Sequence, residues 1–500
     1  MTDRSTRSTP AAATGSTAAV DADRAARDSR VIWLLLSASF VVILNETIMS
    51  VAIPHLQSDL GVTVQAAQWL TTAFMLTMAV VIPITGFLLQ RFHTRPVFIA
   101  AMSLFSAGTL IAALAPGYEV LLGARVVQAT GTAIMMPLLM TTLMNLVAPK
   151  DRGRIMGRVS TVISVAPAIG PTISGLILNY LSWRWMFWIV LPIAVTMLVI
   201  GIRRVENVTE PRVVPIDVFS VVLSAFGFGG IVFGFSQIGG AAESGGEAGG
   251  SAMVMWISLA VGAVGLAAFI LRQLRLQRSD RALLDLRTFR SRNFSISIGL
   301  MAIMMLTLFG TIILLPIYMQ NVIGLDALQA GLLLLPGGLV MGLAAPTVGR
   351  LFDRVGPTPL LVPGSIVVSA VMWFLAVFAT ETTPAWTVLA AHVMLSLGLA
   401  FMFTPLFTAA LASVEPRLYS HGSAIVGTVQ QVAGAAGTAL FVTILAAQTA
   451  ALRPEMADAA AAAGGVRAAF LVGAILSLFA IVGSALVRRP ADTPAAVVGH

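Results

Sequence analysis

The sequence contains no cysteine, and its 500 residues include only five histidines and four tyrosines. Without cysteine the chain holds no disulfide, thiolate metal ligand or thiol nucleophile. Charged residues make up just 10% of the chain, whereas a soluble domain carries about 25%. So little charge would not keep a chain of this length dissolved, which excludes most soluble folds.

Long apolar runs take the place of the missing charge, and hydrophobic residues account for 57% of the chain. A membrane-spanning helix needs about 20 apolar residues. Fourteen stretches meet this requirement, and only Glu46 and Arg125 place a charge inside one. The stretches are Val31–Pro54, Ala66–Gln90, Val97–Ala115, Val120–Ala148, Val159–Leu181, Trp185–Ile202, Val218–Ile238, Met253–Leu271, Asn293–Ile323, Ala327–Gly349, Thr358–Ala379, Trp386–Val414, Gly422–Ala450 and Ala468–Val487. We therefore predict an all-α integral membrane protein with 14 transmembrane helices.

The basic residues alternate between the two ends of these predicted spans. One side carries 26 of the 30 Lys and Arg residues, and the positive-inside rule assigns that side to the cytoplasm. We predict a multi-pass protein of the bacterial cytoplasmic (inner) membrane with both termini cytoplasmic, 1–30 being a disordered tail and 488–500 a second tail. The net charge of +8 then reflects topology, and we expect no nucleic-acid partner.

An internal repeat divides the chain. Gly61 recurs as Gly324, and the segment that begins at Gly86 recurs at Gly349, in both cases 263 positions later. The repeat predicts an N-terminal six-helix half (31–203), two inserted helices with a basic loop (204–292) and a C-terminal six-helix half (293–487). Two six-span repeats are typical of secondary transporters, which bind substrate near the midplane between the halves.

Glu46 and Arg125 are the candidates for proton coupling. Each lies inside a predicted span, about 12 Å and 8 Å from its outer end at 1.5 Å per residue. An unpaired charge there costs roughly 2.5 to 3.5 kcal/mol on insertion scales, so we hypothesise that Glu46 loads and releases a proton. The alternative is a static ion pair that orients two helices.

Polar and apolar side chains in or near the spans are candidates for a substrate cavity, although each could instead pack or hydrogen-bond between helices. They are Asn45, Met49, Trp69, Gln128, Tyr318, Gln320, Phe403 and Gln430. His392, with no acid in its own predicted helix, is expected to be a hydrogen-bonded structural histidine.

Several motifs together resemble the major facilitator superfamily, and within it the fourteen-span drug:proton antiporters, with variants similar to the lincomycin-resistance branch. The resemblance covers almost the whole chain from Val31 to Val487. It is carried by a first-helix signature at Leu44–Pro54, a fourth-helix signature (Leu121, Arg125, Gln128, Gly131), an exporter motif (Gly170, Pro171, Gly175) and paired gating loops (Gly86, Arg91, Arg95 and Gly349, Asp353, Arg354, Gly356).

The resemblance implies a proton-coupled antiporter that exports amphipathic drugs or other toxic small molecules, with protons and membrane lipids as its other partners. We expect a monomer without enzymatic activity, cofactor or metal. The sequence departs from the family pattern at Asn45, where an acid is usual, and at Gln90 and His93, which replace Asp and Gly in the first gating loop.

Three other functions stay open: a proton-coupled nutrient or osmolyte importer, a lipid transporter, and a membrane receptor that has lost transport. A membrane enzyme is disfavoured because the acidic residues outside the spans are scattered and no histidine cluster accompanies them.

Overall fold

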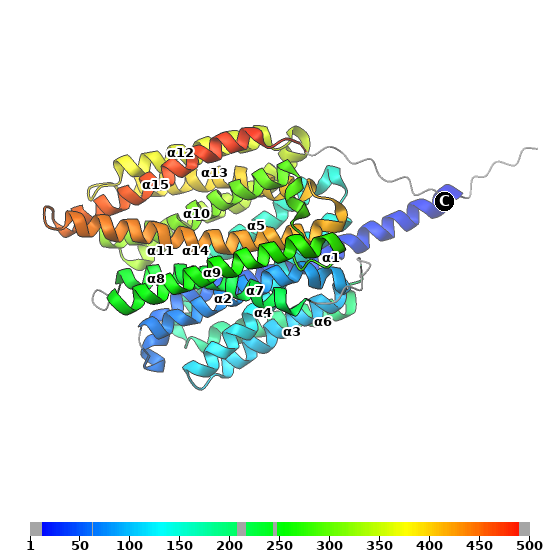
Figure 1. Cartoon of the computed structure of the whole chain (residues 1–500), viewed down its shortest axis with the longest axis horizontal. Coiled ribbons are helices and arrows are strands. Elements are labelled where there is room, and N and C mark those ends of the chain that lie inside the picture. Colours follow the sequence, from blue (N-terminus) through cyan, green and yellow to red (C-terminus); the bar gives the residue numbers. More distant parts are fainter. Residues whose placement is uncertain (1–12, 63, 208–216, 244–247, 490–500) are drawn as a thin grey trace, which may run out of the picture.

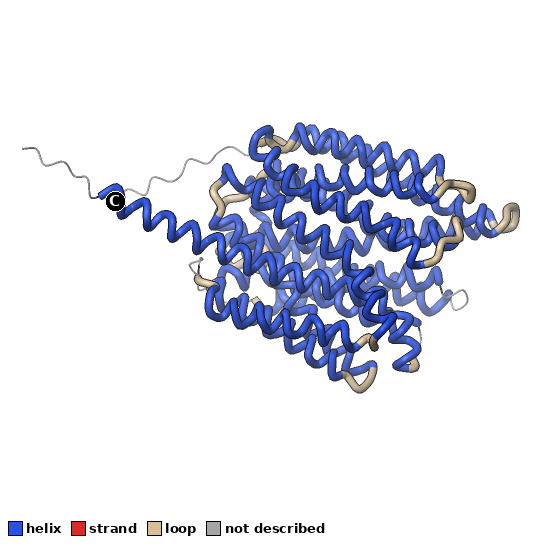
Figure 2. The backbone as a smooth tube through the Cα atoms, turned by 180° about the vertical axis from the view of Figure 1, so that it is seen from behind, coloured by secondary structure: helices blue, strands red, loops and turns tan. Residues whose placement is uncertain are grey.

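The structure is a computed structural model that describes residues 13–62, 64–207, 217–243 and 248–489. The described residues are almost entirely helical (Figure 2). The α-helices are α1 (Ala13–Leu60), α2 (Val64–Arg91), α3 (Thr94–Leu114), α4 (Tyr118–Leu146), α5 (Arg152–Tyr180), α6 (Arg184–Arg204), α7 (Val218–Ser224), α8 (Gly230–Glu243), α9 (Ala248–Leu276), α10 (Arg292–Asn321), α11 (Ala327–Val355), α12 (Thr358–Phe378), α13 (Ala385–Ala412), α14 (Tyr419–Leu452) and α15 (Asp458–Leu486). The short helices are η1 (Pro149–Asp151), η2 (Ala225–Gly229), η3 (Gln277–Ser279), η4 (Leu286–Arg290) and η5 (Pro416–Leu418).

The helices are long and apolar enough for 14 membrane crossings within the described residues. This confirms the predicted fold class. The seventh crossing is composite, since α7, a π-helical turn at η2 and α8 follow one another without a break.

Helix α1 begins well before the first predicted span. It runs from Ala13 to Leu60 as one helix, and its first turns project beyond the bundle (Figure 1). The expectation of a disordered tail is therefore wrong over residues 13–30, where alanine-rich sequence with good helix propensity extends the spanning helix. Residues 1–12 and the tail after residue 489 lie outside the described residues.

Two sets of helices face one another across two long seams. Helix α5 packs along α11, and α2 packs along α14. The first seam is close because glycines line it: a Cβ added at Gly157 would lie 2.5 Å from the Ala345 carbonyl oxygen, and small residues let helices approach in this way. Helices α1–α6 thus meet α10–α15, as two transporter halves do.

The inserted helices pack on each other and against the α2–α14 seam. Glycines bring them close, since a Cβ on Gly230 would lie 2.8 Å from the Cα of Gly262 in α9. Their ends are tied by Arg272, which donates to both carboxylate oxygens of Asp217 at 2.6 and 2.8 Å. This hydrogen bond lowers the pKa of Asp217 below its ordinary value.

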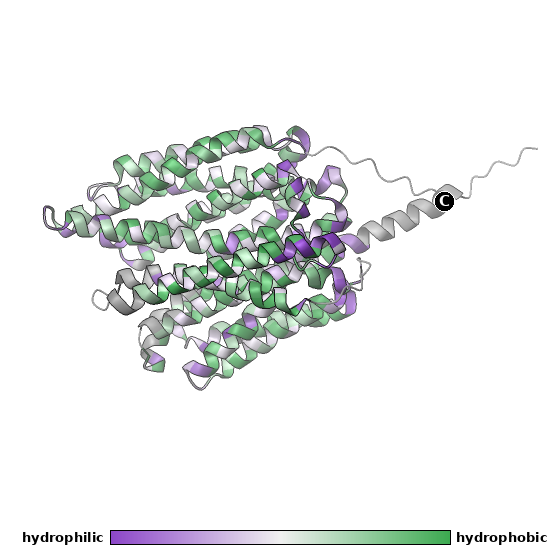
Figure 3. Cartoon of the chain, viewed as in Figure 1, coloured by the Kyte–Doolittle hydropathy of each residue, from purple (hydrophilic) through white to green (hydrophobic). Residues whose placement is uncertain are grey.

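Hydrophilic residues gather at the two ends of the bundle, most densely at the end from which α1 projects (Figure 3). Arginines occupy the last turns of α2, α6, α9 and α11 at this end. We call it the basic end.

Candidate functional site

A buried arginine lies at the centre of the N-terminal half. The Arg125 side chain on α4 is only 1% exposed. One of its Nη atoms donates to the side-chain oxygens of Asn45, at 3.4 Å, and Gln128, and its guanidinium carbon lies 4.1 Å from the ring centroid of Phe74. Gln128 in turn donates to Thr109 Oγ1 at 2.8 Å. Helices α1, α2, α3 and α4 therefore converge on one cation.

The partners of Arg125 are neutral. Its Nε atom is buried without a hydrogen-bond partner, and no carboxylate within the described part of the chain comes within ion-pair distance of it. A cation so desolvated, with one donor unsatisfied, is costly to hold. It is a place where an approaching carboxylate would be stabilised.

Glu46 lies next to this cluster without joining it. It follows Asn45 on α1, so its side chain is turned about 100° away around the helix. Glu46 is half-buried, and no ion pair joins it to Arg125 or to another described residue. The ion pair between Glu46 and Arg125, which the sequence left open as an alternative, is absent in this conformation, because Asn45 occupies the position that faces Arg125.

The exporter motif packs against the same turn of α1. Gly170 on α5 lies so close to Thr47 that an added Cβ would be 3.0 Å from the Thr47 Cβ. Gly175 has open space around it, and the side chain of Pro171 lies outside the described residues. Only Gly170 of this motif is thus seen to govern helix approach at the candidate site.

The other cavity candidates are scattered. Met49 is buried on α1 near Asn45. In the C-terminal half, the side-chain nitrogen of Gln430 on α14 lies 4.0 Å from the sulfur of Met305 on α10. Phe403 stacks on Phe407 within α13. The remaining three have other surroundings: Trp69 contacts Phe233 of the inserted helix α8, Tyr318 donates to the Thr380 carbonyl oxygen at 2.6 Å, and Gln320 is exposed.

The second gating loop closes the basic end of the α5–α11 seam. The two carboxylate oxygens of Asp353 accept the backbone N–H groups of Gly153 and Arg154 at 2.8 and 2.7 Å. These are free donors at the start of α5, and the positive end of a helix dipole favours a carboxylate there. Gly349 packs directly on the Gly153 backbone, whereas Arg354 is exposed and Gly356 ends α11 at a φ of 82°.

The first gating loop closes the α2–α14 seam differently. Gln90, at the position equivalent to Asp353, donates to the Arg417 carbonyl oxygen at 3.0 Å, and a Cβ on Gly86 would lie 3.1 Å from the buried His421 ring. His93 has an ordinary φ of −62°, so a glycine is not needed there.

The arginines of the first loop make local contacts. Arg95 donates to the Ile202 carbonyl oxygen at 2.7 Å, and Arg91 lies 5.9 Å from the Phe92 ring centroid.

Sequence reasoning missed Phe74, Thr109 and His421. An aromatic residue in an apolar helix carries no signal that it will cover an arginine, and Thr109 is one of many span threonines. His421 was missed because the predicted span began one residue later, whereas α14 begins at Tyr419. His392 contacts the Leu334 carbonyl oxygen at 3.2 Å, as expected of a structural histidine.

Two six-helix halves meeting along two seams, closed at one end and holding a buried polar cluster, define a multi-pass membrane transporter. The chain belongs to the Major Facilitator Superfamily, whose model matches residues 35–438.

Relatives in this superfamily extend over most of the chain. It is 41% identical to the MFS-type transporter YcnB of Bacillus subtilis, over 92% of this chain and 95% of that one. It is 40% identical to the lincomycin resistance protein LmrB of Listeria monocytogenes, over 92% and 96% of the two chains. The human organic anion transporter MFSD10 (TETRAN) shares the fold with a TM-score of 0.64 at 13% identity, over 91% of this chain and 99% of that one.

Proposed function

We propose that the protein is a proton-coupled antiporter that exports amphipathic, often cationic compounds across the bacterial cytoplasmic membrane, with both termini in the cytoplasm. The observation that carries the proposal is the half-buried Glu46 beside a desolvated Arg125 whose hydrogen-bond partners are neutral. Ionisable residues inside a membrane protein are expensive and mark ion pathways.

The arrangement supports exchange of a proton for a substrate. With Glu46 protonated, the site holds a single positive charge on Arg125. Loss of the proton leaves a carboxylate, which either Arg125 or a cationic substrate can neutralise. Competition between proton and substrate for one carboxylate would link their movements in opposite directions.

The direction and the substrate class rest on similarity. Gly170 contacts α1 within the motif that resembles those of exporters, and the relative LmrB is named for lincomycin resistance. Lincomycin carries an amine and an apolar tail, so it fits the proposed class. The closed basic end corresponds to a transporter shut toward the cytoplasm, one of the two states that alternating access requires.

Uptake into everted membrane vesicles from an efflux-deficient host tests the proposal. Wild-type vesicles should accumulate lincomycin when the interior is made acidic, and Glu46→Gln should lose this pH-driven accumulation. Glu119→Gln, which changes an exposed acid at the start of α4, is the matched control and should transport normally. Proton-driven transport by Glu46→Gln at the wild-type rate would contradict the proposal.

A further inference from the structure

The inserted helices α7–α9 touch both halves of the transporter. Helix α8 packs on α14 of the C-terminal half and on α2 of the N-terminal half, and η2 also packs on α2. Alternating access requires the two halves to rock against each other. When the α2–α14 seam opens, a pair of helices that lies across it stays with one side only.

The segment that joins α9 to α10 ties the inserted helices together at the basic end. We call residues 277–291 the strap. Its central residues Leu283 and Leu284 are buried, and their backbone N–H groups donate to the side-chain oxygen of Gln273 on α9 at 2.8 and 3.2 Å. Gln273 is also buried, and its side-chain nitrogen donates to Ser220 Oγ on α7 at 2.8 Å. One side chain thus joins α7, α9 and the strap.

The strap is held in turn by two helices of the C-terminal half. His421, buried in the first turn of α14, interacts with the backbone of Leu283. The ring of Phe289 packs edge-on against that of Phe294 on α10, with centroids 5.4 Å apart. The Phe289 carbonyl oxygen accepts the Ser295 hydroxyl of α10 at 2.9 Å. A continuous path of directional contacts therefore runs from α7 through Gln273 and the strap to α10 and α14.

Toward α2 the inserted helices present small and apolar groups. A Cβ on Gly229 in η2 would lie 3.3 Å from Val80 Cγ2 and 3.4 Å from Leu76 Cδ1. The ring of Phe233 on α8 contacts that of Trp69, with centroids 5.4 Å apart. Apolar contacts of this kind are not directional, so they allow one helix to slide along another, as in shear motions of packed helices.

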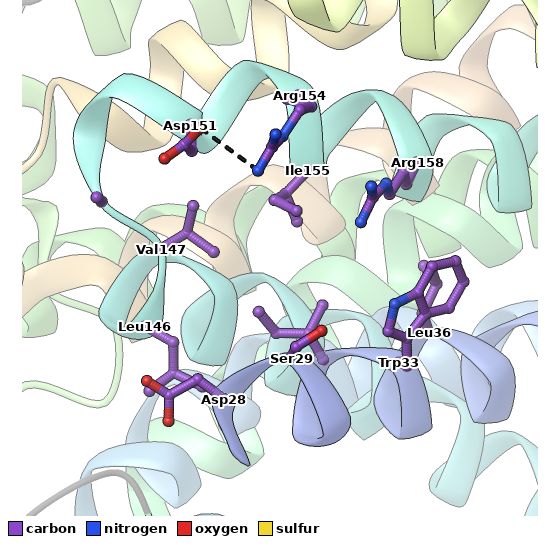
Figure 4. A pocket seen from close by; sticks show the side chains of 12 residues that line it. Asp28, Ser29, Trp33, Leu36, Leu146, Val147, Asp151, Arg154, Ile155 and Arg158 are labelled. Carbon is purple, nitrogen blue, oxygen red and sulfur yellow. Dashed lines mark ion pairs between the residues drawn. The ribbon is translucent and has the colours of Figure 1, made fainter. Parts of the chain in front are cut away.

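Charged side chains between α1 and α5 at the basic end bind within the N-terminal half. Arg154 on α5 pairs with Asp151 at 3.5 Å, and the guanidinium carbon of Arg158 lies 5.6 Å from the ring centroid of Trp33 on α1 (Figure 4). These contacts strengthen the N-terminal half as a separate body and add no bond to the inserted helices.

We propose that the inserted helices move with the C-terminal half as one body, and that their contact with α2 is the surface that slides when the basic end opens and closes. Gln273 is the positioning residue of this arrangement, because loss of its side chain would leave the buried N–H groups of Leu283 and Leu284 without their acceptor, which is costly. This grouping of helices depends neither on the identity of the substrate nor on proton coupling.

Double electron–electron resonance on the purified full-length protein tests the grouping. Phe92→Cys, Arg275→Cys and Arg350→Cys, introduced two at a time, place spin labels at exposed positions of the N-terminal half, α9 and the C-terminal half. Distances are compared in acidic and neutral buffer, with and without lincomycin, and in Asp353→Asn, which removes the carboxylate between α11 and α5. The separation of the Phe92 and Arg350 labels reports opening of the basic end.

The three distances should behave differently. The separation of the Phe92 and Arg275 labels should shift in the same samples as the separation of the Phe92 and Arg350 labels, whereas the separation of the Arg275 and Arg350 labels should stay constant. The proposal would be overturned by a distance between the Arg275 and Arg350 labels that shifts on opening, or by a distance between the Phe92 and Arg275 labels that does not.

Variants of Gln273 test the link itself. Gln273→Leu should roughly double the width of the distance distribution between the Arg275 and Arg350 labels, because the strap amides lose their buried acceptor. Gln273→Glu keeps acceptor oxygens for these amides and should retain the wild-type width. Gln320→Leu, at an exposed glutamine near the end of α10, is the matched control. Equal widths for Gln273→Leu and this control, or equal broadening by Gln273→Leu and Gln273→Glu, would refute the role of Gln273.

Discussion

The carboxylate of Asp353 holds α11 against the start of α5 at the basic end, and Asp353→Asn should weaken this contact. Asp353 accepts two backbone N–H groups at the start of α5, at 2.8 and 2.7 Å. A hydrogen bond to a charged group contributes about 1.5 to 3 kcal/mol and a neutral one about 0.5 to 1.5 kcal/mol. An asparagine keeps one neutral acceptor in place of two charged ones. Because Asp353 is partly exposed, its charged hydrogen bonds are weakened by solvent, so we expect the substitution to reduce the stability of the closed state relative to the open state by about 2 kcal/mol.

A loss of about 2 kcal/mol changes an equilibrium constant roughly 30-fold. A protein that is about 99% closed at the basic end would then become about three-quarters closed. The chain has no cysteine, so Lys150→Cys and Arg350→Cys introduce the only thiols, on the exposed basic ends of the two halves.

Double electron–electron resonance between spin labels at these two positions measures the separation of η1 and α11. The wild type should give one dominant short distance, and Asp353→Asn should add a longer one with a substantial share of the population. Glu206→Gln, at an exposed acid away from the seam, is the matched control. Identical distance distributions for Asp353→Asn and the control would refute the assignment of the lock.

Two further predictions concern packing and pH. Gly131→Ala should lower the melting temperature in detergent through a loss of about 1 to 3 kcal/mol of stability, because an added Cβ would lie 2.7 Å from the Phe105 backbone nitrogen. Gly123→Ala, with open space on the same helix, should leave the melting temperature unchanged. Equal melting temperatures for the two variants would show that α3 and α4 need no close approach. Asp217→Asn should be less stable than wild type at neutral pH, because a carboxyl whose pKa is lowered on folding stabilises the fold at pH values above its ordinary pKa of 3.8. That contribution is lost as the pH falls through the lowered pKa, so the melting temperatures of the two proteins should converge in acid. A difference in melting temperature that stays constant with pH would exclude the charge of Asp217 as the cause of the difference.

The helical membrane architecture was predictable because its cause is local. The length of an apolar run predicts each span, and the positions of the arginines predict the direction in which successive spans cross the membrane. The start of α1 was missed because the residues before Val31 carry no apolar signal, whereas their helix is continued from the span that follows. The π-helical turn at Ala225–Gly229, which packs against α9, was missed because an apolar run carries no signal for it.

The candidate site was only partly predictable. Asn45, Arg125 and Gln128 could be chosen as polar residues inside spans, and the structure brings these three together. Whether Glu46 or its neighbour faces the arginine depends on helix rotation, which an apolar sequence leaves undefined. Trp69 and Tyr318 were chosen by residue type alone, and they contact α8 and a loop carbonyl respectively.

The two gating loops show how duplicated sequence diverges while each seam stays closed. Asp353 and Gln90 occupy equivalent positions, but the acid binds the amide donors of α5 whereas the amide binds a carbonyl oxygen before α14. A carboxylate is required only where it meets free N–H groups at a helix start, so Gln90 does not imply a lost gate. The charge-assisted contact is the stronger of the two. Release of the α5–α11 seam should therefore limit opening of the basic end, and the α2–α14 seam should follow it.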